Sequence, residues 1–232
     1  MLSFQLYQLQ QVDTRCDQLR EEIQALETQL ANREAVVRAE WALRRASDQV
    51  AEAQRVLAQA EAEAEAVREK LRRTERALYD GSVRNPKDLQ DLQREAEALK
   101  RLLARREDVE LRAMMALDEA EKELLAAEEQ LKRVKAQRRQ DEARWLGDLE
   151  EKRQALAALE ARGADLRAEL SAEVLAVYEN VRQSRHGLAV ATVHDGACDA
   201  CGAPLTPALL QAARKGEPLA FCHTCGRILY VP

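Results

Sequence analysis

Four cysteines near the C-terminus are the residues whose types and spacing best suit a defined chemistry. They form two CxxC pairs, Cys198-Asp199-Ala200-Cys201 and Cys222-His223-Thr224-Cys225. About 20 residues separate the pairs, a spacing typical of zinc sites, and tetrahedral Zn²⁺ takes four thiolates at about 2.3 Å. A glycine follows each pair, where the backbone must turn so that its N–H groups face the sulfur atoms. We therefore predict one zinc ion per chain, bound by Cys198, Cys201, Cys222 and Cys225.

Two other uses of these cysteines are less compatible with the sequence. Two disulfides would also account for four cysteines, but a reducing compartment disfavours them. A thioredoxin-like redox motif needs one CxxC at the start of a helix in an α/β domain, and strands do not alternate with helices in this sequence. A site closed by four cysteines leaves no position for water, so the predicted zinc is structural and not catalytic.

The segment that carries the cysteines is predicted to be a small β-rich zinc ribbon over residues 187–232. It has few large apolar residues, and a domain of about 45 residues normally needs a metal or disulfides to fold. Residues 188–193 and 227–231 are rich in β-branched and aromatic side chains and are expected to form strands. Residues 207–212 are expected to form a short helix between the cysteine pairs.

The rest of the chain has the composition of long helices. Of the 232 residues, 33% are charged and 3% aromatic, and there are only 8 glycines and 5 prolines, none of them between Ser3 and Tyr79. Apolar residues recur in alternating steps of three and four, first from Leu6 to Leu30 and then from Leu43 to Leu78. The change of phase near residues 31–42 predicts a register slip within one continuous helix.

A helical hairpin follows from the position of the helix breakers. Asp80-Gly81 and Asn85-Pro86 interrupt the pattern, which then resumes and runs to Gly163. Two arms of about 75 residues, each about 110 Å long if fully helical, are joined by a short turn, which favours antiparallel neighbours. The alternative is two separate helices that pair with other chains. The predicted fold is mainly α, with an antiparallel coiled-coil hairpin over residues 1–162 (turn about 80–86), a connecting helix over 163–186 and the ribbon.

Two segments resemble a known family, the bacterial C4-type zinc-ribbon proteins with an N-terminal coiled-coil hairpin. The turn segment from Leu78 to Gln93 is similar to the family's hairpin tip, and Cys222-His223-Thr224-Cys225-Gly226-Arg227-Ile228-Leu229-Tyr230 is similar to its C-terminal signature. His223-Thr224 departs from the usual Pro-Asn-like filling of that signature, without changing the ligands. The resemblance implies a cytoplasmic adaptor without enzymatic activity. It also implies nucleic-acid binding or partnership with an alternative RNA polymerase sigma factor, in flagellar or type III secretion gene control.

Basic clusters are candidate nucleic-acid contacts in a chain whose net charge is −5. The candidate nucleic-acid contacts lie at the hairpin tip, on the second arm and in the ribbon: Arg72, Arg73, Arg76, Arg84 and Lys87; Lys132, Arg133, Lys135, Arg138 and Arg139; and Arg214, Lys215 and Arg227. Ordinary solvated coiled-coil flanks, paired with glutamates on the same or the facing helix, would have the same composition. Base stacking needs exposed aromatic rings. In the ribbon only Phe221 and Tyr230 qualify, and we expect Phe221 to lie in the core; Trp41 and Trp145 are expected to pack.

Two classes of function remain from the sequence. One is an adaptor that binds DNA or RNA in transcription or nucleic-acid metabolism, without catalysis of its own. The other is a protein-interaction scaffold or chaperone that docks a sigma factor or a secretion component. A small-molecule substrate is not expected, since no glycine-rich phosphate loop occurs. Neither a signal peptide nor a membrane-spanning run is expected, because the N-terminus lacks a basic start and no stretch approaches 18 apolar residues.

Overall fold

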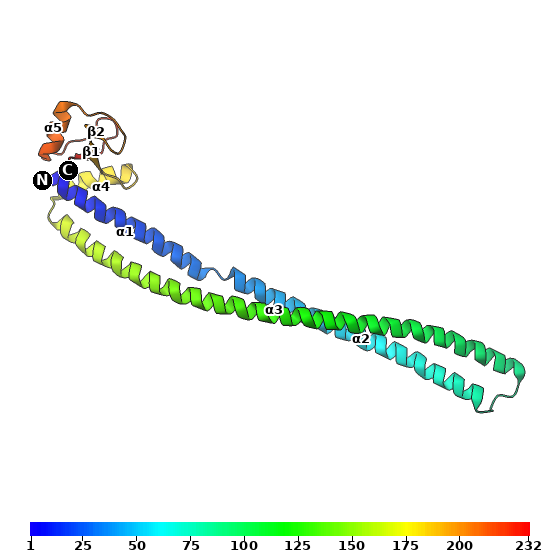
Figure 1. Cartoon of the computed structure of the whole chain (residues 1–232). Helices are drawn as coiled ribbons and strands as arrows, with labels where there is room; N and C mark the ends of the chain where they lie inside the picture. Colours follow the sequence, from blue (N-terminus) through cyan, green and yellow to red (C-terminus); the bar gives the residue numbers. More distant parts are fainter. The chain divides into compact units, whose positions relative to one another are not determined.

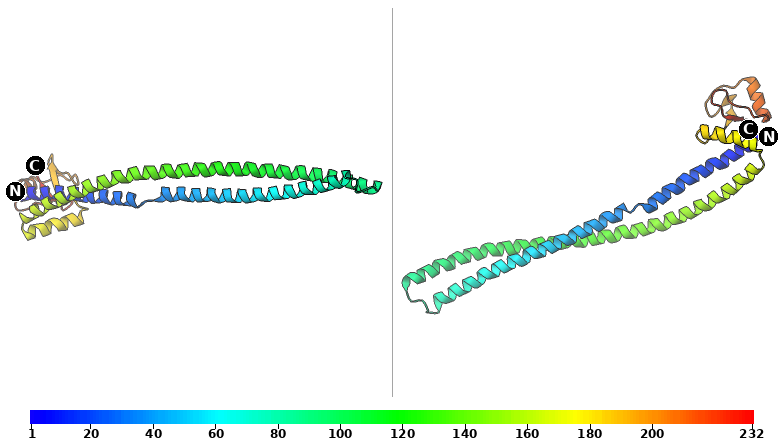
Figure 2. Two further views of the ribbon diagram at one scale, coloured as in Figure 1. Left: turned by 90° about the horizontal axis from the view of Figure 1, so that it is seen from below. Right: turned by 180° about the vertical axis from the view of Figure 1, so that it is seen from behind.

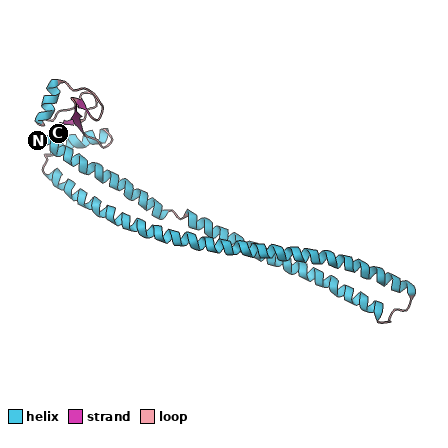
Figure 3. Ribbon diagram, in the orientation of Figure 1, coloured by secondary structure: helices cyan, strands magenta, loops and turns pink.

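The computed structural model describes residues 1–232, and its helices and strands are labelled in Figure 1. The helices are α1 (Leu2–Ala31), α2 (Glu34–Tyr79), α3 (Pro86–Ala168), α4 (Ala172–Ser184) and α5 (Pro207–Lys215). The strands are β1 (Val190–His194), β2 (Ala197–Cys198) and β3 (Ile228–Tyr230). Figure 3 shows strands only in the C-terminal part of the chain, with long helices elsewhere. The predicted fold class, a long helical hairpin followed by a small sheet, is confirmed. None of the helices has a stretch apolar and long enough to cross a bilayer.

The turn between the long arms lies where the sequence predicts it. α2 ends at Tyr79 and α3 begins at Pro86, which fits the first helical position because it needs no N–H there. The side chain of Asn85 accepts a hydrogen bond of 3.1 Å from the Lys87 N–H and so caps α3. Gly81 has a φ of +75°, a left-handed conformation that glycine adopts without strain.

The first arm consists of two helices rather than one. The sequence predicts a register slip within a continuous helix, but α1 ends at Ala31 and α2 begins at Glu34. Asn32 between them is extended, with φ −72° and ψ 112°. Asparagine favours such conformations because its side chain competes for the backbone hydrogen bonds of a helix. The change of heptad phase therefore coincides with a break, and the prediction of an uninterrupted arm is wrong at this point.

The third helix continues past the residue at which the sequence predicts its end. The helical pattern predicts an end at Gly163, whereas α3 extends to Ala168. A Cβ added at position 163 would lie 3.0 Å from Nη1 of Arg167 and at an ordinary contact distance of 3.4 Å from Cγ1 of Val12. Glycine leaves room there for the Arg167 guanidinium, which binds Asp13 of α1, and this contact offsets an intrinsic helix cost of about 1 kcal/mol. The connecting helix expected over 163–186 is the shorter α4, which begins at Ala172.

The chain forms two compact units, which we describe separately. The first unit comprises residues 33–140, that is α2 and the part of α3 that follows the turn. The second unit comprises residues 1–32 and 141–232, that is α1, the remainder of α3 and the C-terminal elements.

In the first unit, ion pairs between helices show that α2 and α3 run antiparallel. Residue numbers rise along α2 while those of the partners fall along α3. The pairs include Glu40–Lys135, Glu63–Arg106 and Glu75–Lys100, with N···O distances of 2.7 to 2.8 Å. Alanines fill much of the buried seam, and an apolar cluster of Leu71, Ala96 and Leu99 lies toward the turn. Each exposed pair contributes little to stability, but together the pairs favour one register.

In the second unit, the ribbon shares its hydrophobic core with two helices. The sheet order is β2-β1-β3, with β1 antiparallel to β2 and parallel to β3. One buried cluster joins Leu6 and Leu9 of α1, Tyr178 of α4, Val190 of β1 and Ile228 of β3. Both views in Figure 2 place the two chain termini at this group of elements. The ribbon is therefore packed on α1 and α4 rather than attached only through a linker.

Candidate metal centre and its docking on the first helix

The two cysteine pairs come together at one point of the ribbon. The Sγ atoms of Cys198 and Cys225 lie 3.8 Å apart, and those of Cys201 and Cys222 lie 3.7 Å apart. All four sulfur atoms lie within 4.8 Å of one another. A tetrahedron with metal–sulfur bonds of about 2.3 Å has edges of about 3.8 Å, so the four sulfur atoms fit around one metal ion. No disulfide joins the cysteines, and no other group of metal-ligating side chains in the chain has such a geometry.

Each cysteine pair lies on the same kind of backbone turn. In the first turn the Gly202 N–H donates to the Cys198 carbonyl oxygen at 2.7 Å. In the second turn the Gly226 N–H donates to the Cys222 carbonyl oxygen at 2.8 Å. The two glycines have φ values of +73° and +71°, which other residues rarely adopt. The predicted role of these glycines in turning the chain is confirmed.

Burial and hydrogen bonds shift the pKa values of Cys198 and Cys225 in opposite directions. Burial raises the pKa of Cys198 to about 12, although the backbone N–H groups of Ala200 and Cys201 act in the opposite direction. Burial also raises the pKa of Cys225, but hydrogen bonds from the backbone and side chain of Arg227 and from neighbouring thiols outweigh it and lower the pKa to about 6. A metal ion would displace the remaining protons, because thiolates are the binding form.

Arg227 is part of this centre and not a free surface cation. Besides its hydrogen bond to Cys225, its Nε donates to the Leu188 carbonyl oxygen at 2.9 Å. Its guanidinium therefore ties the second cysteine turn to the chain entering β1, and it places positive charge beside the sulfur atoms. Charge alone places Arg227 among the candidate nucleic-acid contacts in the sequence. Its position directly after CxxCG is the signal for a role in the metal centre.

A glutamine side chain joins α1 to the central strand of the ribbon. The Gln10 amide nitrogen donates to the Val190 carbonyl oxygen at 2.8 Å, and its amide oxygen accepts from the Val190 N–H at 2.5 Å. The Gln10 side chain thus makes the two backbone hydrogen bonds of Val190 that a neighbouring strand would otherwise make. Nearby, Tyr230 stacks on Tyr7 with ring centroids 4.9 Å apart.

The aromatic residues differ in exposure from the sequence expectation. Phe221, expected in the core, is 41% exposed, because the backbone bridge of Phe221 to Ile228 leaves its ring outside the buried cluster. Tyr230 is half covered by α1. Trp41, expected to pack, is 63% exposed and lies beside the Arg45 guanidinium, because the buried seam of α2 passes through Val36 and Ala39 instead.

A buried carboxylate joins α1, α3 and α4 below the ribbon. The Asp13 carboxylate accepts hydrogen bonds of 2.8 Å from the Arg167 guanidinium and from the Tyr178 hydroxyl. Its side chain is only 8% exposed. Burial, together with the nearby Asp13 charge, raises the pKa of Tyr178 well above its usual range, so the hydroxyl remains a proton donor. Sequence reasoning missed this network; the signal was a carboxylate between Leu9 and Cys16 on the buried face of α1.

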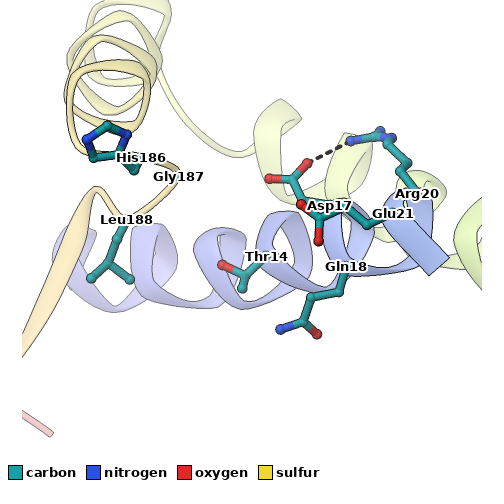
Figure 4. Close-up of a pocket in the computed structure, with 8 residues that line it drawn as sticks. All are labelled: Thr14, Asp17, Gln18, Arg20, Glu21, His186, Gly187 and Leu188. Atoms are coloured by element: carbon teal, nitrogen blue, oxygen red, sulfur yellow. Dashed lines mark hydrogen bonds and ion pairs between the residues drawn. The ribbon is translucent and has the colours of Figure 1, made fainter. Parts of the chain in front are cut away.

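A hollow of about 540 Å³ lies between α1 and residues 186–188. Figure 4 shows Asp17 and Arg20 turned toward each other on its wall, and their hydrogen bond measures 3.0 Å. Asp17 also pairs with Arg182. Asp17 and Arg20 on this wall are therefore already paired, and Glu21 is the one lining carboxylate without an ion pair.

The candidate nucleic-acid residues at the hairpin tip fall into two groups. Arg72 and Arg73 form ion pairs with Glu65 and Glu69 on the same helix, as expected for solvated coiled-coil flanks. Arg76, Arg84 and Lys87 form no ion pair. The basic side chains of the tip that form no ion pair therefore lie at or next to the turn.

The candidates on the second arm and in the ribbon are also only partly free. Arg133 pairs with Glu129 at 3.2 Å, Lys135 pairs with Glu40 at 2.8 Å, and Arg138 is half-buried on the seam. Lys132, Arg139, Arg214 and Lys215 are exposed without an ion pair. Since α3 is continuous, about 70 Å of helix separates Lys87 from Lys132. The structure therefore does not unite the tip and arm clusters into one surface.

Comparisons with solved structures find the same fold in three bacteria. CT398 from Chlamydia trachomatis is 18% identical, with a TM-score of 0.78 over 100% of this chain and 98% of that one. A protein from Mycobacterium smegmatis is 18% identical, with a TM-score of 0.63 over 99% and 98% of the two chains. The HP0958 protein from Helicobacter pylori is 14% identical, with a TM-score of 0.54 over 98% and 95%. At these identities the likeness concerns the fold alone.

Sequence comparison identifies the family. No curated protein matches the chain. The family model of the CT398-like coiled coil hairpin domain matches residues 9–186, which include all of α2, α3 and α4 and most of α1. The resemblance noted from the turn and the C-terminal signature is thus confirmed, and the chain belongs to the CT398-like coiled coil hairpin family.

Proposed function

We propose that this protein is a non-catalytic adaptor in which one zinc ion holds the ribbon together and exposed cations bind nucleic acid. The zinc assignment rests on the donor set, because four thiolates in a tetrahedron of this size suit Zn²⁺. Cys198, Cys201, Cys222 and Cys225 would hold it, and its contribution would be to cross-link the two cysteine turns. A site closed by four protein ligands has no place for a substrate or an activated water, which supports the absence of catalysis.

The nucleic-acid part of the proposal rests on the hairpin turn. Arg76, Arg84 and Lys87 have no carboxylate partner within ion-pair distance, whereas the neighbouring Arg72 and Arg73 do. Unpaired cations are available to phosphate groups without first breaking an ion pair. Tyr79, at the end of α2, is 81% exposed beside them, and an exposed aromatic ring can stack on an unpaired base.

A salt series on matched variants tests this proposal. We expect the wild-type protein to bind single-stranded RNA or DNA at low salt, with log affinity falling linearly as log salt rises. The triple variant Arg76→Gln, Arg84→Gln, Lys87→Gln should reduce the slope by about one for each phosphate that is no longer neutralised. The double variant Arg72→Gln, Arg73→Gln removes two cations that are already paired and serves as the control. If the wild-type protein binds neither nucleic acid at low salt, the function lies with a protein partner.

A protein-interaction scaffold is the second candidate, favoured by the exposure of Trp41. Val37 and Trp41 are 58% and 63% exposed and lie one turn apart on α2. Exposed tryptophans are typical anchors of protein interfaces, and the family resemblance suggests an RNA polymerase sigma factor or a secretion component as the partner. Two results together would favour this candidate. The wild-type protein would bind a purified partner but no nucleic acid, and Trp41→Ala would lose the binding of that partner.

A further inference from the structure

The outer face of α3 carries an apolar patch that no other element covers. Leu111, Met114 and Met115 are 55%, 51% and 65% exposed. Their spacing of three and four residues places them together within about one helical turn. Ala113, by contrast, is buried on the seam that faces α2. The patch is therefore not part of the hairpin core, although methionine and leucine are favourable contact residues.

Four pairs of charged residues around this patch have opposite signs at equal distances from Met115, whereas Glu107 and Glu123, eight residues to either side, are both acidic. Three residues before it stands Arg112 and three after it Asp118; seven before stands Asp108 and seven after Lys122. The same alternation of sign holds farther out. Arg101 and Glu129 lie equally far from Met115 along the chain, as do Glu97 and Arg133. All eight side chains are exposed. Each of these four pairs therefore combines a positive with a negative side chain.

We propose that this face is an interface with a second copy of this chain, the two α3 helices crossing antiparallel on a two-fold axis at Met115. An isologous interface requires that each patch complement itself. Antiparallel pairing centred on Met115 brings Arg112 opposite Asp118 and Asp108 opposite Lys122, each pair occurring twice. In-register parallel pairing would place every charge against its own copy. The charge order thus favours a second copy in one orientation over an unrelated partner.

The apolar side chains supply the affinity and the charges supply the orientation. Within one chain Arg112 pairs with Asp108 and Lys122 with Asp118. Both pairs are exposed, so exchanging them for pairs between chains changes the free energy little. The wrong orientation is disfavoured by like charges, which is how charged rims select partners. Because the patch is small, we expect weak association, with a Kd of about 10 μM or above.

Sedimentation velocity of the full-length protein tests the interface. The wild type should pass from monomer to dimer between about 1 μM and 1 mM, the range in which small interfaces dissociate. Met115→Glu places two carboxylates together on the axis and should weaken association at least about tenfold. The matched control is Leu146→Glu, since Leu146 is similarly exposed on α3 but outside this face. Equal helix content by circular dichroism shows that the variants remain folded.

Charge exchange tests the orientation independently of the apolar patch. Arg112→Glu alone and Asp118→Arg alone should each weaken dimerisation several-fold, because each creates a like-charge pair across the axis. The double variant restores opposite charges and should recover wild-type association. A wild type that stays monomeric throughout the concentration range overturns the proposal. So does a dimer that Met115→Glu leaves intact, or a double variant no better than either single one.

Discussion

In the ribbon, the glycines that follow the cysteine pairs and Arg227 hold the four thiols in place. The two cysteine turns use the same glycine and the same backbone hydrogen bond, so four thiols converge although about 20 residues separate the pairs. Arg227 adds a hydrogen bond to Cys225 and balances charge there. A metal ion bound at this point would therefore contribute directly to the folding of the ribbon.

Cys222→Ser should remove the metal and unfold the ribbon while leaving most of the helix content. Three thiolates and a hydroxyl bind Zn²⁺ much more weakly than four thiolates, and the ribbon's own core is small. Elemental analysis should fall from one zinc per chain to none, and amide signals from residues 187–232 should lose dispersion. Cys16→Ala, which changes a cysteine outside the cluster, should retain the zinc. A Cys222→Ser ribbon that stays folded without metal would contradict the proposed role.

Gln10→Leu should weaken the attachment of the ribbon to α1. The substitution leaves the Val190 N–H and carbonyl without the partners that Gln10 provides. Two buried polar groups without partners cost about 2–6 kcal/mol of unfolding free energy. The neighbouring Gln11 is exposed, and Gln11→Leu should change stability by less than about 0.5 kcal/mol. Urea denaturation measures both, and equal effects of the two substitutions would argue against the strand-like role of Gln10.

At the scale of elements, α1, α3 and α4 are joined by one buried carboxylate. Asp13→Ala should destabilise the unit by about 3 kcal/mol, because it leaves the buried Tyr178 hydroxyl without an acceptor and the partly buried Arg167 guanidinium with Glu179 as its only carboxylate partner. Tyr178→Phe removes one hydrogen bond and should cost about 1 kcal/mol. Chemical denaturation should rank the variants in this order. A smaller loss in Asp13→Ala than in Tyr178→Phe would mean that the network is solvated rather than buried.

The register of α2 against α3 can be measured with paired spin labels. Labels at positions 40 and 135 replace a contacting pair, Glu40 and Lys135, and should lie within about 20 Å, given helix axes 8–10 Å apart. Labels at positions 40 and 106 should lie more than about 40 Å apart, since 1.5 Å of rise separates successive residues of α3. Double electron–electron resonance on dilute protein resolves the two cases. A short 40–106 distance would indicate a different register, and 40–135 proximity that disappears on dilution would indicate pairing between chains.

At the scale of the whole molecule, metal removal should affect the two compact units differently. The ribbon's core includes Leu6 and Leu9 of α1, so chelation should lower amide protection both in residues 187–232 and in the first turns of α1. Residues 50–75 belong to the other unit and should keep their protection, because their burial comes from α3. Hydrogen exchange with and without chelator measures this, and added zinc should reverse the change. Unchanged protection in α1 would show that the ribbon and α1 open independently.

The sequence by itself determined the features that depend on residues close together in the chain, namely the cysteine turns, the long helices and the start of α3. The CxxC spacing and its glycines predicted the cysteine cluster, because a turn of a few residues positions both sulfur atoms of a pair. The 3-4 periodicity predicted the long helices, and Asn85-Pro86 predicted the start of α3, since caps and helix breakers act within one turn of helix. These signals needed no knowledge of what lies opposite each element.

Only the tertiary structure decided which polar and apolar residues have partners. Gly163 lies beside the Arg167 guanidinium that Asp13 of α1 binds, and Gln10 and Asp13 are buried because β1, α3 and α4 cover them. The same holds for the basic cluster on α3: Lys135 pairs with Glu40 of α2 whereas Lys132 forms no ion pair, although both belong to one run of positive charge in the sequence. Burial and ion pairing depend on the residue brought across from a distant segment. A periodic apolar pattern shows that one face of a helix will be buried, but it does not identify the residues that pack against that face.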